Sequence, residues 1–579
     1  MNIGAFTCVI SVCLLKIQVK SVARLTQGFG ADHLELLRAI DGGQMWMHDY
    51  KIIDVRIVDG TGAAYFHGEV AVRNGIIVEL GRRVTGDAGR VIDGQGLVLS
   101  PGFIDSHSHS DTTWFVDRRG ESKLMQGVTT EVTGQCGASA APFTEKRKAF
   151  QMESTTEEGS PVKWTTFSEY LDELERNSVG LNIAPLVGHS AIRSSTMGFD
   201  RRPPTQAELE EMKGHIVEAM EAGAFGYSTG LIYPPSSYAD TQELIELAKA
   251  MAPYGGIYAT HMRNEGLRLL ESVDEAIAVG RESGVPVQIS HHKVSAEKGW
   301  GLVKESLKMI EEARAEGVDV LCDQYPYIAS ATSLTSIIPG WAHEGGPKAL
   351  LARLKDPEVG AKLKQTVDES RSNGGWARLL ITSVRSEQNR FAQGKRIPEI
   401  AAIWGISEVE AAWRLLIEEE LEVGEANFGM CEEDVKTVMA HRCVMIGSDS
   451  SSTAVDGPLA KGHPHPRTFG TFPRVLGKYT REERVLTLEQ AVYKMTGMAA
   501  ARVGLWDRGV IRPGAKADLV LFNPDTIIDT ATFDNPRRYP EGIEWVMVNG
   551  VMVIENGRHT GQIAGEVLRR PGSAGARRK

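Results

Sequence analysis

The stretch that decides the fold is SPGFIDSHSHSD, at residues 100–111. Its short apolar run, Phe103-Ile104, leads to two histidines spaced one residue apart, His107 and His109. Alternate residues of an extended chain point the same way, so both imidazoles can project from one strand end toward one metal ion. A His-x-His pair alone is weak evidence, because such pairs also occur on protein surfaces by chance. The interpretation therefore depends on residues farther along the chain.

Further candidate ligands each follow a short apolar run: Cys136, His261, His291 and Asp449. A (β/α)8 barrel places its functional side chains in this way, at the carboxyl ends of its strands. Eight apolar runs qualify as barrel strands, the number that a closed barrel needs. They end near Asp105, Thr133, Val187, Tyr227, Thr260, Ser290, Cys322 and Ser448. We therefore predict an α/β protein whose TIM-like (β/α)8 barrel spans residues 101–504, with a metal centre at the rim.

Other segments do not belong to the eight predicted barrel strands. Short strand patterns at 47–100, with a hairpin signal at Asn74-Gly75, precede the first barrel strand, and a similar pattern returns at 505–565. The two chain ends are therefore expected to form one small β-sandwich. A helical, charged region at about 340–440 separates the last two barrel strands and is predicted to be an inserted subdomain, because long insertions often cover a barrel's active site.

Composition narrows the function. The chain has 579 residues, 42% of them hydrophobic, and a formal net charge of −11. This charge argues against nucleic acid or an anionic membrane as partner and favours an enzyme acting on a small molecule. Six cysteines in so long a chain do not form a disulfide framework, so a reducing cytoplasm is the expected location. The sequence does not specify an oligomeric state.

The two termini are expected to lie outside the folded domains. Residues 4–15, GAFTCVISVCLL, are apolar but too short to span a bilayer, and no basic residue precedes them. We interpret residues 1–46 as an upstream extension, with Met45 or Met47 as alternative starts; a targeting role is the alternative. Residues 566–579, which end in RRPGSAGARRK, are predicted to be a disordered basic tail.

Taken together, the motifs resemble the D-aminoacylase (N-acyl-D-amino-acid deacylase) family of the amidohydrolase superfamily. The resemblance covers about residues 50–560 and rests on PGFIDSHSHSD, GQCG, GYSTGLIYPP, YATHMRNEG, QISHHK, DQYPY, IGSD and HPHPRTFGTFPRVLG. Many binuclear relatives bridge their metals with a carboxylated lysine, whereas this chain offers a cysteine in GQCG. The resemblance implies zinc-dependent hydrolysis of the amide bond of N-acyl-D-amino acids.

The family pattern also assigns roles to residues of this sequence. It implies a tight zinc at Cys136, His261 and His291, and a second, weaker position at His107, His109 and Asp449. Thiolate and imidazole ligands suit Zn²⁺. By the same resemblance Asp449 is the general base that later protonates the leaving amine, and Tyr325 donates to the developing oxyanion, with Tyr327 as its local rival. The substrate carboxylate is assigned to Arg467, with Lys293 and Tyr233 as helpers.

Alternatives stay open at this point. Alone, Cys136 could be a small buried hydrophobe, Asp449 a helix cap and Arg467 a structural arginine. The serine that the family usually offers after DQYPY is displaced to Ser330 or Ser333, and the stretch SSSTAVDGPLAKG before HPHPR is long. Both departures are on the substrate side, so they concern the side-chain preference rather than hydrolysis. A cyclic amidohydrolase of the hydantoinase or dihydroorotase type shares the scaffold but has a bridging lysine. A non-catalytic binding protein is the third reading. His189, His463 and His465 are expected in supporting or packing roles, and His292 faces away from the site.

Overall fold

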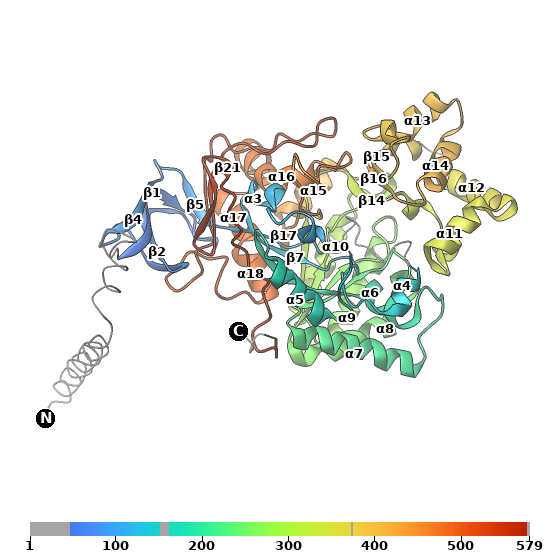
Figure 1. Ribbon diagram of the computed structural model, residues 1–579, viewed down its shortest axis with the longest axis horizontal. Helices are drawn as coiled ribbons and strands as arrows, with labels where there is room; N and C mark the ends of the chain where they lie inside the picture. The colour runs from blue at the N-terminus through green and yellow to red at the C-terminus, as the bar shows by residue number, and fades with distance from the viewer. Residues whose placement is uncertain (1–46, 151–160, 372–373, 576–579) are drawn as a thin grey trace, which may run out of the picture.

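The structure is a computed structural model that describes residues 47–150, 161–371 and 374–575. The predicted N-terminal extension, residues 1–46, lies outside the described residues. Figure 1 shows a small β domain at one side, a barrel in the middle and a mainly helical insertion at the other side. Within the part of the chain that is described, no helix is both long and apolar enough to cross a membrane.

Eight parallel strands form the barrel, as predicted, and each predicted strand end lies within three residues of an observed one. One run of the sheet pairs β6, β7 and β8, and the other pairs β9, β10, β11, β12, β13 and β17. Only Leu186 separates β8 from β9, which continue as one barrel strand. The strands are β6 (Phe103–Asp105), β7 (Val128–Thr133), β8 (Asn182–Pro185), β9 (Val187–Gly188), β10 (Gly226–Gly230), β11 (Ile257–His261), β12 (Val287–Ile289), β13 (Val320–Gln324) and β17 (Val444–Ile446).

The barrel closes between β6 and β17. Ser106 Oγ donates to the Ile446 carbonyl at 3.0 Å, and the Asp449 N–H donates to the His107 carbonyl at 2.9 Å. A parallel bridge between Ser108 and Ser450 continues the pairing. The first and last predicted ligand segments are therefore neighbours, although more than 300 residues separate them in the sequence.

Helices alternate with the strands, and local sequence signals set their ends. In the helix predicted at 205–222, Thr205 caps the first turn in a reciprocal capping box with Glu208, and Gly223 ends it with a φ of 119°. The helices of the barrel part are α3 (Glu121–Leu124), α4 (Glu145–Phe150), α5 (Phe167–Asn177), α6 (His189–Met197), α7 (Gln206–Ala222), α8 (Thr241–Met251), α9 (Leu269–Ser283), α10 (Val303–Ala315), α15 (Glu432–Ala440), α16 (Arg467–Arg474), α17 (Leu488–Met495) and α18 (Gly497–Val503).

The two chain ends meet in one sheet. Strand β5 pairs antiparallel with β18, so the N-terminal and C-terminal strands are hydrogen-bonded into one nine-stranded sheet. Along β18, Leu519 and Leu521 face the core of the small domain, while Val520 and Phe522 face the barrel core. The strands are β1 (His48–Ile57), β2 (Phe66–Arg73), β3 (Ile76–Gly81), β4 (Ala88–Asp93), β5 (Val98–Pro101), β18 (Leu519–Phe522), β19 (Ile543–Val548), β20 (Val551–Glu555) and β21 (Arg558–His559).

The insertion between β13 and β17 has its own core, with buried residues from Leu334 to Val423. Its bounds differ from the predicted 340–440. Strand β14 starts it at Ser330, and α15 belongs to the barrel because Val435, Val438 and Met439 pack into the barrel core. Its elements are β14 (Ser330–Ser333), β15 (Leu379–Val384), β16 (Val423–Asn427), α11 (Gly346–Lys355), α12 (Pro357–Arg371), α13 (Ile397–Trp404) and α14 (Glu408–Glu418).

The prediction of a disordered tail is wrong for residues 566–575. Val567 bridges to Ile183 on β8 and is buried. The Arg569 guanidinium then pairs with Asp172 at 2.7 Å and Glu175 at 2.9 Å, both on α5. A basic, glycine-containing composition suggested disorder, but the apolar anchor and the facing carboxylates hold this segment against the barrel.

Candidate metal centre

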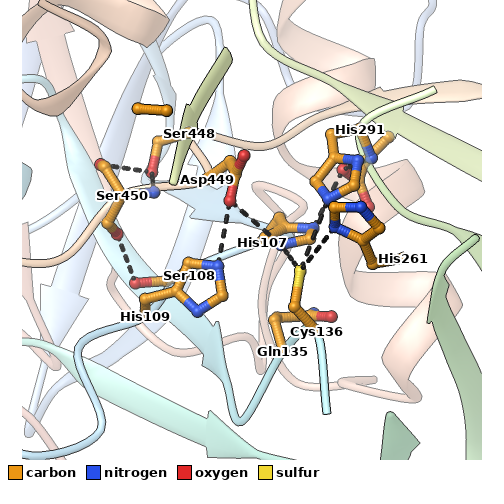
Figure 2. Close-up of polar contacts among 12 residues, drawn as sticks. His107, Ser108, His109, Gln135, Cys136, His261, His291, Ser448, Asp449 and Ser450 are labelled. Atoms are coloured by element: carbon orange, nitrogen blue, oxygen red, sulfur yellow. Dashed lines mark hydrogen bonds and ion pairs between the residues drawn. The ribbon is translucent and has the colours of Figure 1, made fainter. Parts of the chain in front are cut away.

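A thiol surrounded by imidazole nitrogens forms the centre of the site. Cys136 Sγ lies 3.3 Å from His107 Nε2, 3.7 Å from His261 Nδ1 and 3.5 Å from His291 Nε2. Figure 2 shows these side chains converging from different strand ends. Tetrahedral Zn²⁺ with ordinary Zn–S and Zn–N bond lengths separates a sulfur from a nitrogen ligand by about 3.6 Å. The donor set and its spacing therefore fit zinc.

Asp449 lies beside this cluster and joins the remaining predicted ligand to it. Its Oδ1 is 3.0 Å from His109 Nε2 and 3.5 Å from His107 Nε2. Its Oδ2 is 2.9 Å from Arg467 Nη1. Ligand atoms of His107, Cys136, His291 and Asp449 all lie within 4.8 Å of one another, and all four residues are buried. All six predicted ligands are thus brought together.

Burial and mutual attraction shape the charges in the site. Burial opposes ionisation of the Cys136 thiol, but the adjacent His107 and His291 hold its pKa well below the ordinary value. Burial likewise opposes the Asp449 carboxylate, yet Arg467 and His291 keep its pKa well below its usual range. Burial disfavours the charged form of His109, but hydrogen bonding to Asp449 outweighs it and raises the His109 pKa to about 9. Thiolate and carboxylate forms, which metal ligands require, are favoured.

Three of the candidate ligands sit in strained backbone conformations. Cys136, His291 and Asp449 have φ values of 52°, 37° and 51°, in the left-handed region that non-glycine residues rarely adopt. Each costs of order 1–3 kcal/mol and persists only where the surroundings enforce it. The His291 N–H donates to Asp323 Oδ1 at 2.7 Å, and the Asp449 N–H bond to His107 closes the barrel. The fold thus supplies the constraint that directs these side chains inward.

Two buried carboxylates orient the histidines, and the sequence reasoning missed both. Asp323 Oδ1 lies 3.2 Å from His107 Nδ1. Glu265 lies 2.9 Å from His291 Nδ1 and 3.4 Å from His261 Nε2. A carboxylate on the second ring nitrogen fixes the orientation of a metal-binding histidine. Glu265 lies in YATHMRNEG and Asp323 in DQYPY, so the quoted motifs contained the signal.

A buried lysine holds the β6 and β17 ends together. Lys123 Nζ donates to Asp105 Oδ2 and to Ser448 Oγ, both at 2.7 Å, and to the Ser450 carbonyl at 2.8 Å. Asp105 and Ser448 each precede a candidate ligand, His107 and Asp449, by one or two residues. Lys123 is therefore a positioning residue for both strand ends, which no spacing in the sequence indicated.

The predicted substrate-binding residues occupy different places around the centre. The Arg467 guanidinium, at the start of α16, lies over the Tyr325 ring at 4.7 Å and donates to the Ala331 carbonyl of β14 at 3.3 Å. Tyr233 packs edge-on to His261 with ring centroids 5.0 Å apart, and its hydroxyl contacts Thr332 Oγ1 at 3.0 Å. Lys293 was predicted to help bind the substrate carboxylate.

The structure places the Lys293 ammonium behind a ligand. Its Nζ is 2.8 Å from His291 Nδ1 and 2.7 Å from Glu265 Oε1. The two tyrosine rivals also separate. Tyr327 contacts Asp529 Oδ2 at 3.3 Å, away from the ligands, whereas the Tyr325 ring centroid lies 6.4 Å from that of His291.

The other histidines hold the surroundings together. His292 contacts Ser306 at 2.8 Å, which confirms that it faces away. His189 bonds to Ser236 and Glu243 in a separate buried network. His465 contacts the Ala329 carbonyl at 3.0 Å and accepts from the Arg467 N–H at 3.0 Å, so it positions the start of α16. His463 lies farther out, at the Phe533 carbonyl.

Known proteins are similar to this chain in amino-acid sequence. A family model described as "Amidohydrolase family" matches residues 90–554. A D-aminoacylase of Alcaligenes xylosoxydans xylosoxydans is 38% identical over 514 residues, covering 89% of this chain and 96% of that protein. The chain belongs to the amidohydrolase family, in its D-aminoacylase branch. The resemblance predicted from the motifs is confirmed.

Two further relatives extend the comparison. An N-acyl-D-aspartate deacylase of the same organism is 37% identical and covers 91% of this chain and 96% of that protein. The crystal structure of an N-acyl-D-glutamate deacylase from Bordetella bronchiseptica, complexed with zinc and a phosphonate mimic of the tetrahedral intermediate, superimposes with a TM-score of 0.75. It is 34% identical and covers 90% of this chain and 99% of that chain. The relatives thus act on different D-amino-acid derivatives on one scaffold.

Proposed function

We propose that this protein is a zinc-dependent amidohydrolase that hydrolyses N-acyl-D-amino acids to a carboxylate and a free D-amino acid. The observation that carries the proposal is Cys136 Sγ within 3.3–3.7 Å of three histidine nitrogens, with Asp449 and Arg467 beside it. Relatives at 37–38% identity over nearly their whole length bear the names of such deacylases. The α-amino-acid substrate class is inferred from them, and D over L rests on them alone.

The metal site is proposed to hold one tight zinc through Cys136, His261 and His291. His107, His109 and Asp449 would surround a second, weaker position. Bound zinc supplies a Lewis acid for the amide carbonyl and lowers the pKa of water toward neutrality. Glu265 and Asp323 keep the imidazoles oriented, since each contacts a ring nitrogen that faces away from the thiol.

Asp449 is the proposed general base. Its carboxylate is kept ionised by Arg467 and His291 and lies at the edge of the thiol–imidazole cluster. It would take a proton from the attacking water and then deliver it to the leaving amine nitrogen, which balances the proton over the reaction. The side chain is held on a strained, barrel-closing residue, so its carboxylate has little freedom to leave this place.

Arg467 and Tyr325 are proposed to bind the two ends of the reacting group. A planar guanidinium matches the substrate α-carboxylate with two parallel hydrogen bonds. Tyr325 stacks under Arg467 and has its pKa raised far above the ordinary value by burial, so its hydroxyl stays a donor for the oxyanion. Tyr233 lies against His261 at the rim, and Lys293 supports His291 from behind.

The cyclic amidohydrolase alternative has less support. Such enzymes bridge two metals with a carboxylated lysine, and here Cys136 Sγ occupies the space between the histidines. The alternative of a non-catalytic binding protein has no support, since every predicted ligand is present and the ligands lie close together. A cytoplasmic location is proposed because the described cysteines, Cys136, Cys322, Cys431 and Cys443, are all free thiols. The partner is a small-molecule substrate, not nucleic acid or a membrane.

The deciding experiment is an activity panel with the zinc-loaded protein. N-acetyl and N-formyl derivatives of D- and L-amino acids would be assayed beside hydantoins and dihydroorotate. We expect release of free amine from D-derivatives at a rate at least about a hundredfold above that from the cyclic amides. Ring opening without deacylation would overturn the proposal in favour of the cyclic amidohydrolase alternative.

Measurement of the metal content tests directly whether the Cys136 thiol binds zinc. Replacement of Cys136 by alanine removes the soft ligand, so we expect most of the tightly bound zinc and the activity to be lost. Cys322→Ala is the matched control, because Cys322 is also buried but lies inside the barrel core. Mass spectrometric metal analysis after dialysis gives the readout. Full zinc retention in Cys136→Ala would contradict the assignment.

A further inference from the structure

A cavity of about 510 Å³ lies at the end of the barrel opposite the metal centre. Its walls include Ile257, Pro286 and Asp319, which are at or just before the first residues of β11, β12 and β13. The metal ligands His261 and His291 lie at the other ends of two of these strands. The volume suits a small-molecule ligand, for which pockets of roughly 300–1,000 Å³ are typical.

The cavity is lined by positive charge. Four arginines contribute, Arg314, Arg442, Arg502 and Arg570, against a single carboxylate, Asp319. Asp319 Oδ1 is shared between Arg314 at 3.1 Å and Arg502 at 2.9 Å. Such a cluster is unexpected on a chain with a net charge of −11, and it makes the cavity a local attractor for anions.

One of these arginines, Arg570, retains donors for a ligand. The Arg502 side chain is 2% exposed and paired with Asp319, so it contributes positive charge beneath the cavity surface. Arg570, from the C-terminal segment, donates Nε to the Tyr254 carbonyl at 2.8 Å and pairs with no carboxylate of the described residues. Its Nη2 lies 2.9 Å from where a Cβ at Gly255 would be, so the absence of a side chain there makes room for the guanidinium.

Aromatic side chains line the same cavity. Trp506 is 71% exposed and Tyr493 is 37% exposed. Trp506 Nε1 lies 3.9 Å from the Cβ position of Gly504, and Arg570 Nη1 lies 3.8 Å from it, so indole and guanidinium flank one glycine. An exposed indole is costly in water and offers a flat face for stacking.

We propose that this cavity binds a small phosphorylated molecule with a flat ring, of the nucleoside monophosphate type. The phosphate would take the charge-assisted hydrogen bonds of Arg570 in the positive field of the neighbouring arginines, and the ring would stack on Trp506. The site is separate from the metal centre and does not depend on the proposed deacylase activity.

Isothermal titration of the zinc-loaded full chain with adenosine 5′-monophosphate tests the proposal. We expect one binding event with a Kd below about 1 mM. Arg570→Gln should weaken it by about tenfold or more, the loss typical of a hydrogen bond to a charged group. Arg442→Gln, at an exposed position of the lining, removes a second positive charge and should also weaken binding. Arg268→Gln is the matched control, since the Arg268 side chain is exposed and pairs with Glu271.

The ring and phosphate contributions are separated by partial ligands. Trp506→Ala should weaken monophosphate binding by about fivefold or more while leaving inorganic phosphate affinity unchanged. Adenosine alone should bind at least tenfold more weakly than the monophosphate. A phosphate bound at zinc instead would survive Arg570→Gln and inhibit turnover competitively. That result, or no binding at 10 mM ligand, roughly ten times the expected upper limit, would overturn the proposal.

Discussion

Arg467 pairs with Asp449, the proposed general base, and is also the residue proposed to bind the substrate carboxylate. Its Nη1 lies 2.9 Å from Asp449 Oδ2, yet that nitrogen makes no hydrogen bond of good geometry. Arg467 is 4% exposed, its guanidinium is stacked on Tyr325, and its Nη1 still has donor capacity for a carboxylate. Binding of a substrate acid would therefore engage a cation that the fold has already oriented.

Replacement of Arg467 by lysine is expected to lower kcat/KM for an N-acyl-D-amino acid by about tenfold to a hundredfold or more, because a charge-assisted hydrogen bond contributes roughly 1.5–3 kcal/mol. The matching carboxamide should lose much less, since it has no charge to bind. Steady-state kinetics on both substrates provide the measurement. Equal losses on acid and amide would show that Arg467 supports the metal ligands rather than the substrate.

A substitution of Asp449 tests catalysis separately from zinc binding. Asp449→Asn keeps the size of the side chain but cannot accept a proton, so kcat should fall by about 10² to 10⁴. Zinc bound through Cys136 should remain, because none of the three tight ligands is altered. Turnover and metal content would be measured on the same preparation. Near-normal kcat would place the base elsewhere.

At the scale of elements, strand β16 of the insertion contains a buried acid, Glu425, that is not one of the candidate metal ligands. Glu425 on β16 is 1% exposed, and its Oε2 has no hydrogen-bond partner. Burial raises the pKa of Glu425 to about 8, with Arg371 opposing the shift only partly. The carboxyl is therefore neutral in the folded insertion at neutral pH but ionised in the unfolded chain.

This difference makes stability depend on pH. Below the ordinary pKa of 4.5 both states hold the proton, and Glu425 has no pH-linked effect. As pH rises from there toward 8 only the unfolded state loses the proton, so the folded state is progressively disfavoured. Glu425→Gln should consequently stabilise the protein relative to wild type by about 2–5 kcal/mol more at pH 8 than at pH 4.5. Denaturant unfolding at both pH values tests this, with the exposed Glu387→Gln as control; a pH-independent difference would refute the assignment.

At the scale of the whole molecule, segments far apart in sequence complete the site and the barrel. Strand β14 of the insertion brings Ala331 to Arg467 and Thr332 to Tyr233, so the insertion forms one wall of the metal centre. The two chain ends form one sheet through β5 and β18, and the last segment returns to α5. The described segments at 47–101 and 519–575 therefore belong to the folded unit.

Replacement of Arg569 tests the contact between the C-terminal segment and α5. It pairs with two carboxylates of α5 while its own side chain is 6% exposed. Arg569→Ala should lower the free energy of unfolding by about 1 kcal/mol, because partly exposed ion pairs are individually weak. Chemical denaturation gives the value, and activity should be unchanged since the contact is remote from the zinc ligands. Unaltered stability would mean that Val567 and Leu568 alone anchor the segment.

The sequence by itself predicted the barrel and its strand ends and, together with the family resemblance, the six candidate ligands, because apolar periodicity and the residue after each strand are local properties of the chain. It could not determine that Glu265, Asp323 and Lys123 support those ligands, that Lys293 lies behind His291, or that residues 566–575 pack on α5. Each of these contacts depends on which strand ends and loops meet once the barrel has closed. The sequence does not distinguish a carboxylate or ammonium group that is solvated from one that is buried. Only the tertiary structure decides which charges leave water, and therefore which side chains must pair.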